Sequence, residues 1–185
     1  STVYHNTITD WHCVGAIKLI ETYGREAVAN GHKLDARNKK VEAEMIAGMS
    51  FNNANLGYVH AMAHQLGGQY DAPHGVCCAL LLPYVEEYNI IACPDRVAQL
   101  AEIMGENTEG LSTRDSAEVV LKVMKQLSED VGIPHSIKVI GAKPEDFELR
   151  SDNAVTDGNA FLNYRKRTKD DILKIFQAAS EYETS

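Results

Sequence analysis

Apolar residues recur along almost the whole chain at the three- and four-residue spacings that place side chains on one face of an α-helix. No stretch alternates apolar and polar residues for long enough to predict a convincing β-strand. The two patterns are incompatible, because side chains return to one face every 3.6 residues in a helix and every two in a strand. One such stripe comprises Val14, Ile17, Leu19 and Ile20, and a longer one Ala117, Val120, Leu121, Met124, Leu127 and Val131. The sequence therefore predicts an all-α fold, arranged as a helical bundle.

Glycine, proline and capping residues divide this pattern into separate helices. Thr7 or Thr9 is available to cap the first helix, Gly24 to end it, and Gly67-Gly68 to end the third. The expected helices span residues 9–23, 36–56, 58–66, 74–91, 95–104, 112–131 and 168–182, with a short helical start at 143–147. Because no linker, repeat or low-complexity tract interrupts the pattern, we expect a single helical domain over residues 1–185.

Charge and hydropathy exclude two classes of partner. The formal net charge of -8 disfavours a surface that neutralises phosphates, so nucleic acid is not an expected partner. The longest apolar stretch, Val76 to Val85, contains Pro83 and is well short of the roughly 20 residues that cross a bilayer. The N-terminal residues show no basic and apolar regions of a signal peptide. A cytoplasmic protein without a membrane segment is expected.

The four cysteines, Cys13, Cys77, Cys78 and Cys93, show no C-x-x-C pair and fall in segments expected to be helical. Because cysteine is among the most buried residue types, we interpret all four as buried thiols. A disulfide framework and a cysteine zinc site are not expected.

Three of the seven histidines, His60, His64 and His74, lie in one short stretch rich in Gly, Ala and Met. His60 and His64 are four residues apart and share a helix face, and a turn can bring His74 alongside them. Neutral imidazole is a common ligand of divalent transition metals, so the cluster predicts a metal site. Core or capping histidines are the alternative. A metalloprotease helix is excluded, because Ala61 follows His60 where that motif requires Glu.

The residues around this cluster resemble the signature of the iron-containing (group III) alcohol dehydrogenase family. The resemblance extends more weakly over essentially the whole chain. The matching segments are Gly48-Met49-Ser50-Phe51-Asn52-Asn53-Ala54, Leu56-Gly57-Tyr58-Val59-His60-Ala61-Met62-Ala63-His64, Pro73-His74-Gly75-Val76 and Leu82-Pro83-Tyr84. The fold that this resemblance implies is the C-terminal helical domain of the dehydroquinate-synthase-like fold.

In that family an Asp, a His four residues later and two further histidines hold a divalent metal, Fe²⁺ in many members and Zn²⁺ in some. The resemblance implies that His60 and His74 are the two further ligands, whereas helix geometry alone would pair His60 with His64. It assigns His64 to the catalytic site, facing the nicotinamide and the substrate, and Phe51 to a position near the nicotinamide. The implied reaction is hydride transfer between an alcohol or aldehyde and NAD or NADP, in a full-length enzyme expected to be a homo-oligomer.

The first two ligands of the family are not found in this sequence, because no histidine here has Asp or Glu four residues before it. No glycine-rich phosphate-binding motif is present either. The chain is therefore expected to be a fragment that lacks the N-terminal nucleotide-binding domain and the first ligand helix. Because two histidines alone bind metal weakly, we expect the isolated chain to hold little metal and to have no dehydrogenase activity.

Two other functions remain open at this point. A metal-dependent lyase of the dehydroquinate synthase type shares the architecture, although the histidine motifs resemble the dehydrogenases more closely. A non-catalytic helical module that binds a partner through its apolar faces belongs to a different class. The identity of the alcohol, the choice between NAD and NADP and the native metal are not determined by the sequence.

Overall fold

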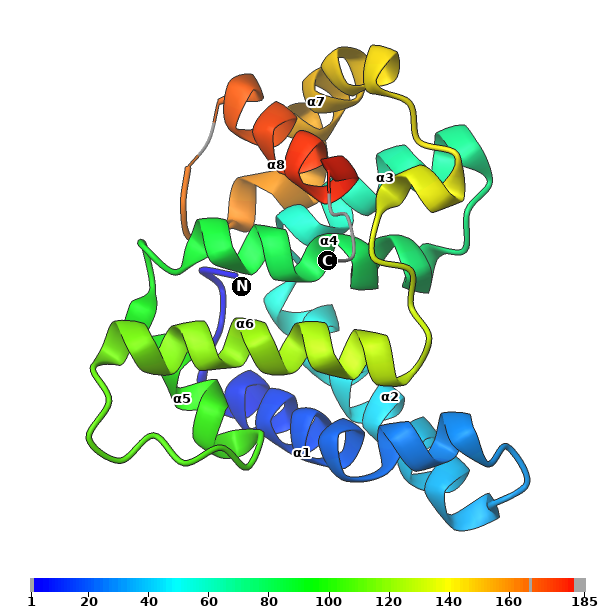
Figure 1. The fold of residues 1–185 in the computed structure, drawn as a ribbon. Helices are drawn as coiled ribbons and strands as arrows, with labels where there is room; N and C mark the ends of the chain where they lie inside the picture. The colour runs from blue at the N-terminus through cyan, green and yellow to red at the C-terminus, as the bar shows by residue number, and fades with distance from the viewer. Residues whose placement is uncertain (1, 167, 182–185) are drawn as a thin grey trace. The chain divides into compact units, whose positions relative to one another are not determined.

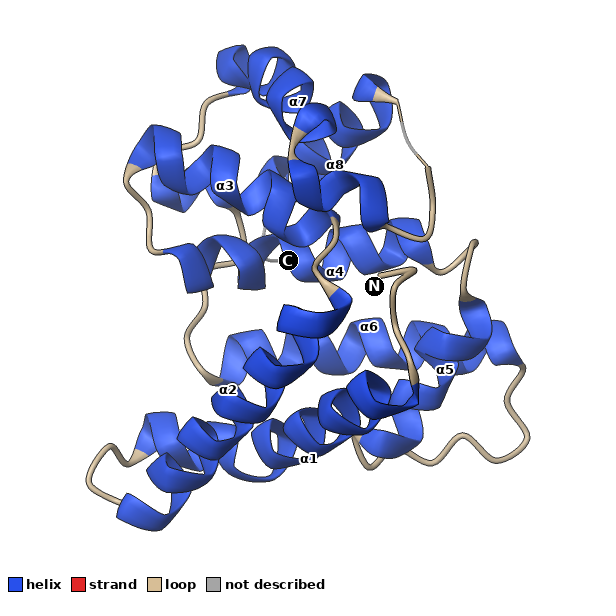
Figure 2. Cartoon of the chain, turned by 180° about the vertical axis from the view of Figure 1, so that it is seen from behind, coloured by secondary structure: helices blue, strands red, loops and turns tan. Residues whose placement is uncertain are grey.

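The computed structural model describes residues 2–166 and 168–181, and over these residues it contains helices and loops without a β-strand (Figures 1 and 2). The all-α prediction is therefore confirmed. The α-helices are α1 (Thr7–Ala29), α2 (Leu34–Ala54), α3 (Tyr58–Tyr70), α4 (His74–Asn89), α5 (Pro94–Ile103), α6 (Thr113–Asp130), α7 (Phe147–Thr156) and α8 (Lys169–Glu181). Three short 3-10 helices are η1 (Ile137–Ile140), η2 (Pro144–Asp146) and η3 (Gly158–Leu162). Tyr182, the expected end of the last helix, lies outside the described residues.

The described residues form two compact units. The histidine unit comprises residues 56–92 and 132–181 and contains α3, α4, α7, α8 and the three 3-10 helices. The paired-helix unit comprises residues 2–55 and 93–131 and contains α1, α2, α5 and α6. The single domain expected over residues 1–185 stays a prediction.

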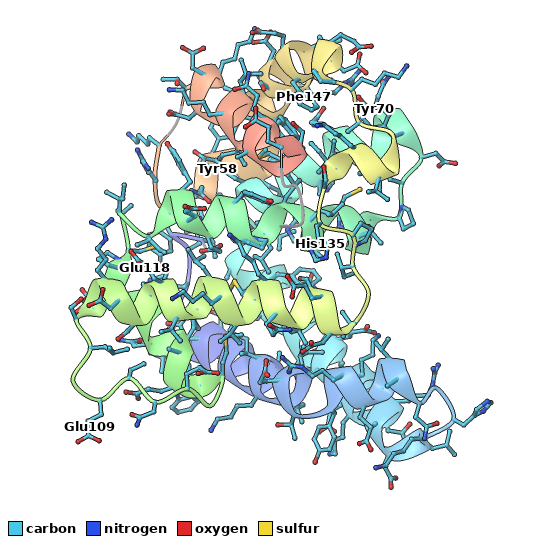
Figure 3. The ribbon with its side chains drawn as sticks, in the orientation of Figure 1. Tyr58, Tyr70, Glu109, Glu118, His135 and Phe147 are labelled. Carbon is cyan, nitrogen blue, oxygen red and sulfur yellow. The ribbon has the colours of Figure 1, made fainter. Side chains whose placement is uncertain are left out.

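The histidine unit is built around an apolar core to which α3, α4, α7 and α8 all contribute. Tyr58 and Phe147, labelled in Figure 3, are among its largest fully buried side chains. The rings of Phe147 on α7 and Phe176 on α8 stack with their centroids 5.7 Å apart. Burying a large apolar side chain contributes about 1.5–3 kcal/mol, so a few such residues fix where α3 and α4 lie.

In the paired-helix unit, α1 lies alongside α2 and α5 alongside α6 (Figure 1). The expected cap of α1 is wrong by a few residues: Asn6 is the N-cap, and its side chain accepts hydrogen bonds from the backbone N–H groups of Ile8 and Thr9. The Thr9 hydroxyl accepts one from the Asn6 N–H, which completes a reciprocal capping box. Ser112 is the N-cap of α6, and its hydroxyl oxygen accepts a hydrogen bond from the Asp115 N–H.

Two expected helix ends are wrong because glycine does not stop a helix whose packing continues. Gly24 is buried inside α1, which runs on to Ala29. Gly67 and Gly68 lie inside α3, which ends only at Tyr70 and is followed by Asp71, a residue with φ of 51°. A glycine inside a helix costs about 1 kcal/mol, which the packing of the surrounding turns offsets. By contrast, Gly132 follows α6 with φ of +77°, as expected for the end of a helix.

No helix within the described ranges is both long enough and apolar enough to cross a membrane.

Candidate metal centre

Helices α3 and α4 place three histidine rings close together. His60 and His64 stand one turn apart on α3, and His74 is the first residue of α4 after the three-residue loop 71–73. The ring centroids are 5.4 Å apart for His60 and His74, 5.6 Å for His64 and His74, and 6.4 Å for His60 and His64. The rings of His60 and His74 therefore face a common region, which is the arrangement that the metal-site prediction requires.

His60 is the least exposed of the three histidines, and its electrostatic state suits a ligand. Burial, together with the neighbouring charges of His74 and His64, lowers the pKa of His60 from 6.5 to about 4. The ring is therefore neutral at neutral pH and keeps a free lone pair on one nitrogen. A divalent ion would bind it without displacing a proton.

Cys78 joins two of these histidines in a potential metal-binding group. One ligand atom from each of His60, His74 and Cys78 lies within 4.8 Å of the other two. Cys78 follows His74 by one turn of α4, and its Sγ is 3.5 Å from His74 Nε2. Burial, reinforced by Cys77, raises the pKa of the Cys78 thiol to about 11, so in the absence of an ion it is a neutral thiol. This donor set of two imidazoles and a sulfur fits a divalent transition metal.

The interpretation of all four cysteines as buried thiols is wrong for three of them. Cys77 is fully buried, Cys78 and Cys93 are partly exposed and Cys13 is exposed. A helix has one face turned to the core, so Cys77 and its immediate neighbour Cys78 point in different directions on α4. The apolar Sγ of Cys77 fills the core, whereas that of Cys78 lies beside the histidines.

His64 has a different partner from the other two histidines. Its Nδ1 is 2.9 Å from Oδ2 of Asp157, the residue that precedes η3. Burial alone would raise the pKa of Asp157, but hydrogen bonds from His64 and from the backbone and side chain of Asn159 outweigh burial and lower it. An ionised carboxylate only accepts hydrogen bonds, so His64 Nδ1 carries the proton and donates it. Nε2 of a neutral His64 ring is then the acceptor.

Buried amides hold the ends of the two histidine-bearing helices. Asn163 Nδ2 donates to Asn89 Oδ1 at the end of α4, over 2.6 Å. The backbone N–H of Tyr58, at the start of α3, donates to Asn163 Oδ1 over 3.4 Å. Both asparagines are buried, where a hydrogen bond is stronger than in water and costly to lose. At the other end of α3, Tyr70 (labelled in Figure 3) donates from its hydroxyl to Asp146 over 2.7 Å.

Phe51 lies near the end of α2 in the paired-helix unit, and 43% of its surface is exposed. Its predicted role near the nicotinamide stays a prediction. Asn53, two residues later, donates its side-chain amide to the Met49 carbonyl one turn earlier.

Sequence reasoning missed Cys78 and Asp157. The spacing that drew attention to His60 and His64, four residues on one helix, also joins His74 to Cys78 and could have identified it. Asp157 is 93 residues from His64 along the chain, and no local pattern indicates that the two meet.

The comparison with known families agrees with this arrangement. Residues 1–180 match the C-terminal region of the Fe-containing alcohol dehydrogenase family. The chain belongs to this family, so the family resemblance inferred from the histidine motifs is confirmed.

Individual relatives support the same assignment. The 1,3-propanediol dehydrogenase of Citrobacter freundii is 52% identical over 174 residues, which are 94% of this chain and 45% of that protein. The NAD-dependent methanol dehydrogenase of Bacillus methanolicus is 40% identical over 172 residues, or 93% of this chain and 45% of that protein. The structure of an alcohol dehydrogenase from Oenococcus oeni superposes with a TM-score of 0.94 at 76% identity, covering 96% of this chain and 46% of the other. The chain thus spans less than half the length of these relatives.

Proposed function

We propose that this chain is the metal-binding, C-terminal part of an iron-containing alcohol dehydrogenase that transfers hydride between a small alcohol or diol and NAD(P). The observation that carries the proposal is the convergence of His60 on α3 and His74 on α4, with ring centroids 5.4 Å apart. Membership of the Fe-containing alcohol dehydrogenase family supports Fe²⁺ as the ion, with Zn²⁺ as the alternative proposed from the sequence resemblance. The relatives named above act as propanediol and methanol dehydrogenases, which supports a short alcohol as the substrate class.

His60 and His74 would hold the ion, because both offer an imidazole nitrogen to the same region. When bound, the ion supplies Lewis-acid activation of the alcohol for hydride transfer. His64 lies beside His74 but donates its Nδ1–H to Asp157, so its Nε2 is free to accept a hydrogen bond from the substrate. His64 therefore orients the alcohol, and Phe51 is proposed to pack near the nicotinamide.

In full-length members of this family, two further ligands and a nucleotide site are proposed to complete the site that His60 and His74 begin. We therefore propose that the active form is a longer enzyme, and that the isolated chain does not oxidise alcohols. A homo-oligomeric full-length enzyme and a cytoplasmic location are also proposed, from the sequence alone.

Replacing His60 or His74 by Ala in the full-length enzyme tests this function. Loss of the ion removes several kcal/mol of transition-state stabilisation, so we expect turnover of 1,3-propanediol with NAD⁺ to fall about a thousandfold. Bound iron and zinc, measured by mass spectrometry, should fall in parallel. His32→Ala, at an exposed loop position, is the matched control and should leave both unchanged. Full turnover without bound metal in either variant would refute the proposal.

The isolated chain offers a second test. Ferrous or zinc ion, an alcohol and NAD⁺ are added to the purified chain, and no reduction of NAD⁺ is expected. Appreciable turnover would contradict the need for further ligands and a nucleotide site.

A further inference from the structure

We propose that the paired-helix unit binds a linear polyamine, a methylene chain that carries several ammonium groups, in a pocket between α5 and α6. The pocket has a volume of about 360 Å³, which is within the range of sites for small ligands. All the described residues that line the pocket belong to this one unit. The inference is independent of the metal centre and of the proposed function.

One wall of the pocket is a polar face of α5. Asp95, Gln99 and Glu102 all line the pocket, and they follow one another at spacings of four and three residues. Residues so spaced lie on the same face of a helix. Because a helix rises about 1.5 Å per residue, the backbones of Asp95 and Glu102 are about 10 Å apart along the helix axis. Two carboxylates therefore stand two turns apart, with the neutral amide of Gln99 between them.

The rest of the pocket supplies hydroxyl groups. Thr108 in the loop after α5, and Thr113 and Ser116 on α6, line the pocket. The hydroxyl of Thr108 donates a hydrogen bond to Glu102 Oε1 over 3.2 Å, which holds that carboxylate at the pocket. Hydroxyl oxygens also accept hydrogen bonds, so every side of the pocket offers acceptors to N–H groups. Of the described residues that line it, none is Lys or Arg.

The side chain of Ser116 points to a ligand. The residue is only 7% exposed and lines the pocket, yet over the described residues its hydroxyl makes no hydrogen bond. Buried hydroxyls usually have a partner, because leaving one without a partner costs free energy. Ser128, on the same helix, donates to the Met124 carbonyl one turn earlier. The Ser116 hydroxyl has no such bond and is available to a molecule in the pocket.

This arrangement suits a chain with separated positive charges better than a single ion. Ca²⁺ and Mg²⁺ need oxygen ligands within about 2.0–2.6 Å, and carboxylates two turns apart do not meet around one ion. No metal-binding group of three side chains among the described residues includes Asp95 or Glu102. An extended triamine such as spermidine, with bonds of about 1.5 Å, spans roughly 11 Å between its terminal nitrogens. Each end would reach one carboxylate, the central ammonium would lie near Gln99, and the methylenes would pack against Leu111.

The charge of the chain adds to this preference. The formal net charge is -8, and a cleft lined by groups of one sign concentrates counter-ions of the other sign. The same charge attracts cations to other acidic surfaces. A test must therefore separate binding in the pocket from general attraction to the protein.

Isothermal titration calorimetry of the chain with spermidine makes this separation. We expect one saturable site that binds spermidine about tenfold more tightly than putrescine, a shorter diamine that reaches only one carboxylate. Asp95→Asn and Glu102→Gln each remove one charge from the pocket and should weaken spermidine binding about fivefold. Ser116→Ala should weaken it about threefold. The matched control is Glu118→Gln, at an exposed residue of α6 outside the pocket (Figure 3), which should leave binding unchanged.

A measurement on the unmodified chain does not depend on how the variants fold. In nitrogen-15 NMR spectra, spermidine should shift the backbone amides of Ala98, Thr108 and Ser116, which line the pocket. The amide of Leu66, in the core of the histidine unit, should not move. Magnesium chloride should weaken spermidine binding no more than sodium chloride of the same ionic strength does.

Four results would overturn the inference. Absence of spermidine binding would remove the site, and equal affinities for spermidine and putrescine would remove the match in length. Equal losses in Glu118→Gln and Glu102→Gln would show general attraction to the acidic surface. Displacement of spermidine by Mg²⁺ beyond the effect of ionic strength would make the pocket a site for a divalent ion. The proposed function would be untouched by any of these, because it is decided by metal content and turnover of the full-length enzyme.

Discussion

The two units differ in the length of their helices and in the contacts that join them. In the paired-helix unit, α1 and α2 are 23 and 21 residues long, and charged side chains pair across helices at the surface. In the histidine unit, the α-helices are 10 to 16 residues long, and buried amides join them. Arg25 bonds Asp130 and Arg96 bonds Asp10 at partly exposed positions, but the asparagine pair of the histidine unit is buried. Buried hydrogen bonds are costly to lose, while surface ion pairs contribute little. The histidines of the candidate metal centre thus lie in the histidine unit, whose short helices are joined by buried hydrogen bonds.

Substitutions in the packed core of the histidine unit should lower the free energy of unfolding most. Phe147→Ala removes a fully buried ring that stacks on Phe176, and we expect a loss of about 3–5 kcal/mol in the free energy of unfolding, measured with urea. Phe161→Ala, at a ring that is 73% exposed in the same unit, is the control and should change stability by less than about 0.5 kcal/mol. Equal effects of the two changes would show that the stability of this unit does not depend on its core.

Removing the buried amide pair should cause the next largest loss in the free energy of unfolding. Asn163→Ala leaves the Asn89 amide without this partner in an apolar region, so a loss of about 1–3 kcal/mol in unfolding free energy is expected. Asn153→Ala, at an exposed position on α7, serves as the control. A loss no larger than that of a surface ion pair would remove the contrast between the units.

The bond between Asp157 and His64 should affect activity more than stability. Asp157→Asn preserves shape but removes the carboxylate that fixes the proton on His64 Nδ1, and we expect turnover of the full-length enzyme to fall about tenfold. Nitrogen NMR of the His64 ring should show the loss of a single tautomer. Asp152→Asn on α7, which loses a surface ion pair with the partly exposed Lys169, is the matched control. Unchanged turnover together with an unchanged tautomer would eliminate Asp157 as a positioning residue.

The smallest change in the free energy of unfolding is expected for the ion pair of Asp10 and Arg96 in the paired-helix unit. The hydrogen bond and charge of Arg96, with a contribution from His5, lower the pKa of Asp10 below its ordinary value of 3.8. Stability from this pair is therefore complete above that value and is lost as the pH falls through the lowered pKa of the folded state. At pH 7, Asp10→Asn should cost about 0.2–1 kcal/mol of unfolding free energy, and the difference from the wild type should shrink as the pH falls below 3.8. A difference in unfolding free energy that grows as the pH falls would contradict a lowered pKa of Asp10.

Local signals in the sequence were sufficient for the fold class and for most helices. The apolar periodicity predicted α6 within one residue at each end, and Thr168 indeed accepts a hydrogen bond from the Asp171 N–H at the start of α8. Helix ends at Gly24 and Gly67 were wrong because local propensity is weaker than the packing that carries α1 and α3 past them. Helix α7 was anticipated only as a short start, and η1 and η3 were missed.

In the candidate site, too, the sequence predicted what depends on neighbouring residues and missed contacts between distant segments. His60, His64 and His74 fall within 15 residues, so their clustering is visible in the sequence. Which imidazole turns toward which partner depends on contacts made elsewhere in the fold. Asp157 reaches His64 from a segment 93 residues away, and the buried Asn163 that braces α3 and α4 lies further still. Periodicity and motifs contain no information about such pairings.

The loop between α3 and α4 is short. Only residues 71–73 separate the two helices, and Asp71 turns the chain with its left-handed backbone. Once an ion has attached to one imidazole, the second is tethered so closely that its local concentration is high and little chain entropy remains to be lost. Lengthening this loop should therefore raise the dissociation rate of a bound ion more than it lowers the association rate. The loop would then help to set how long an ion stays bound.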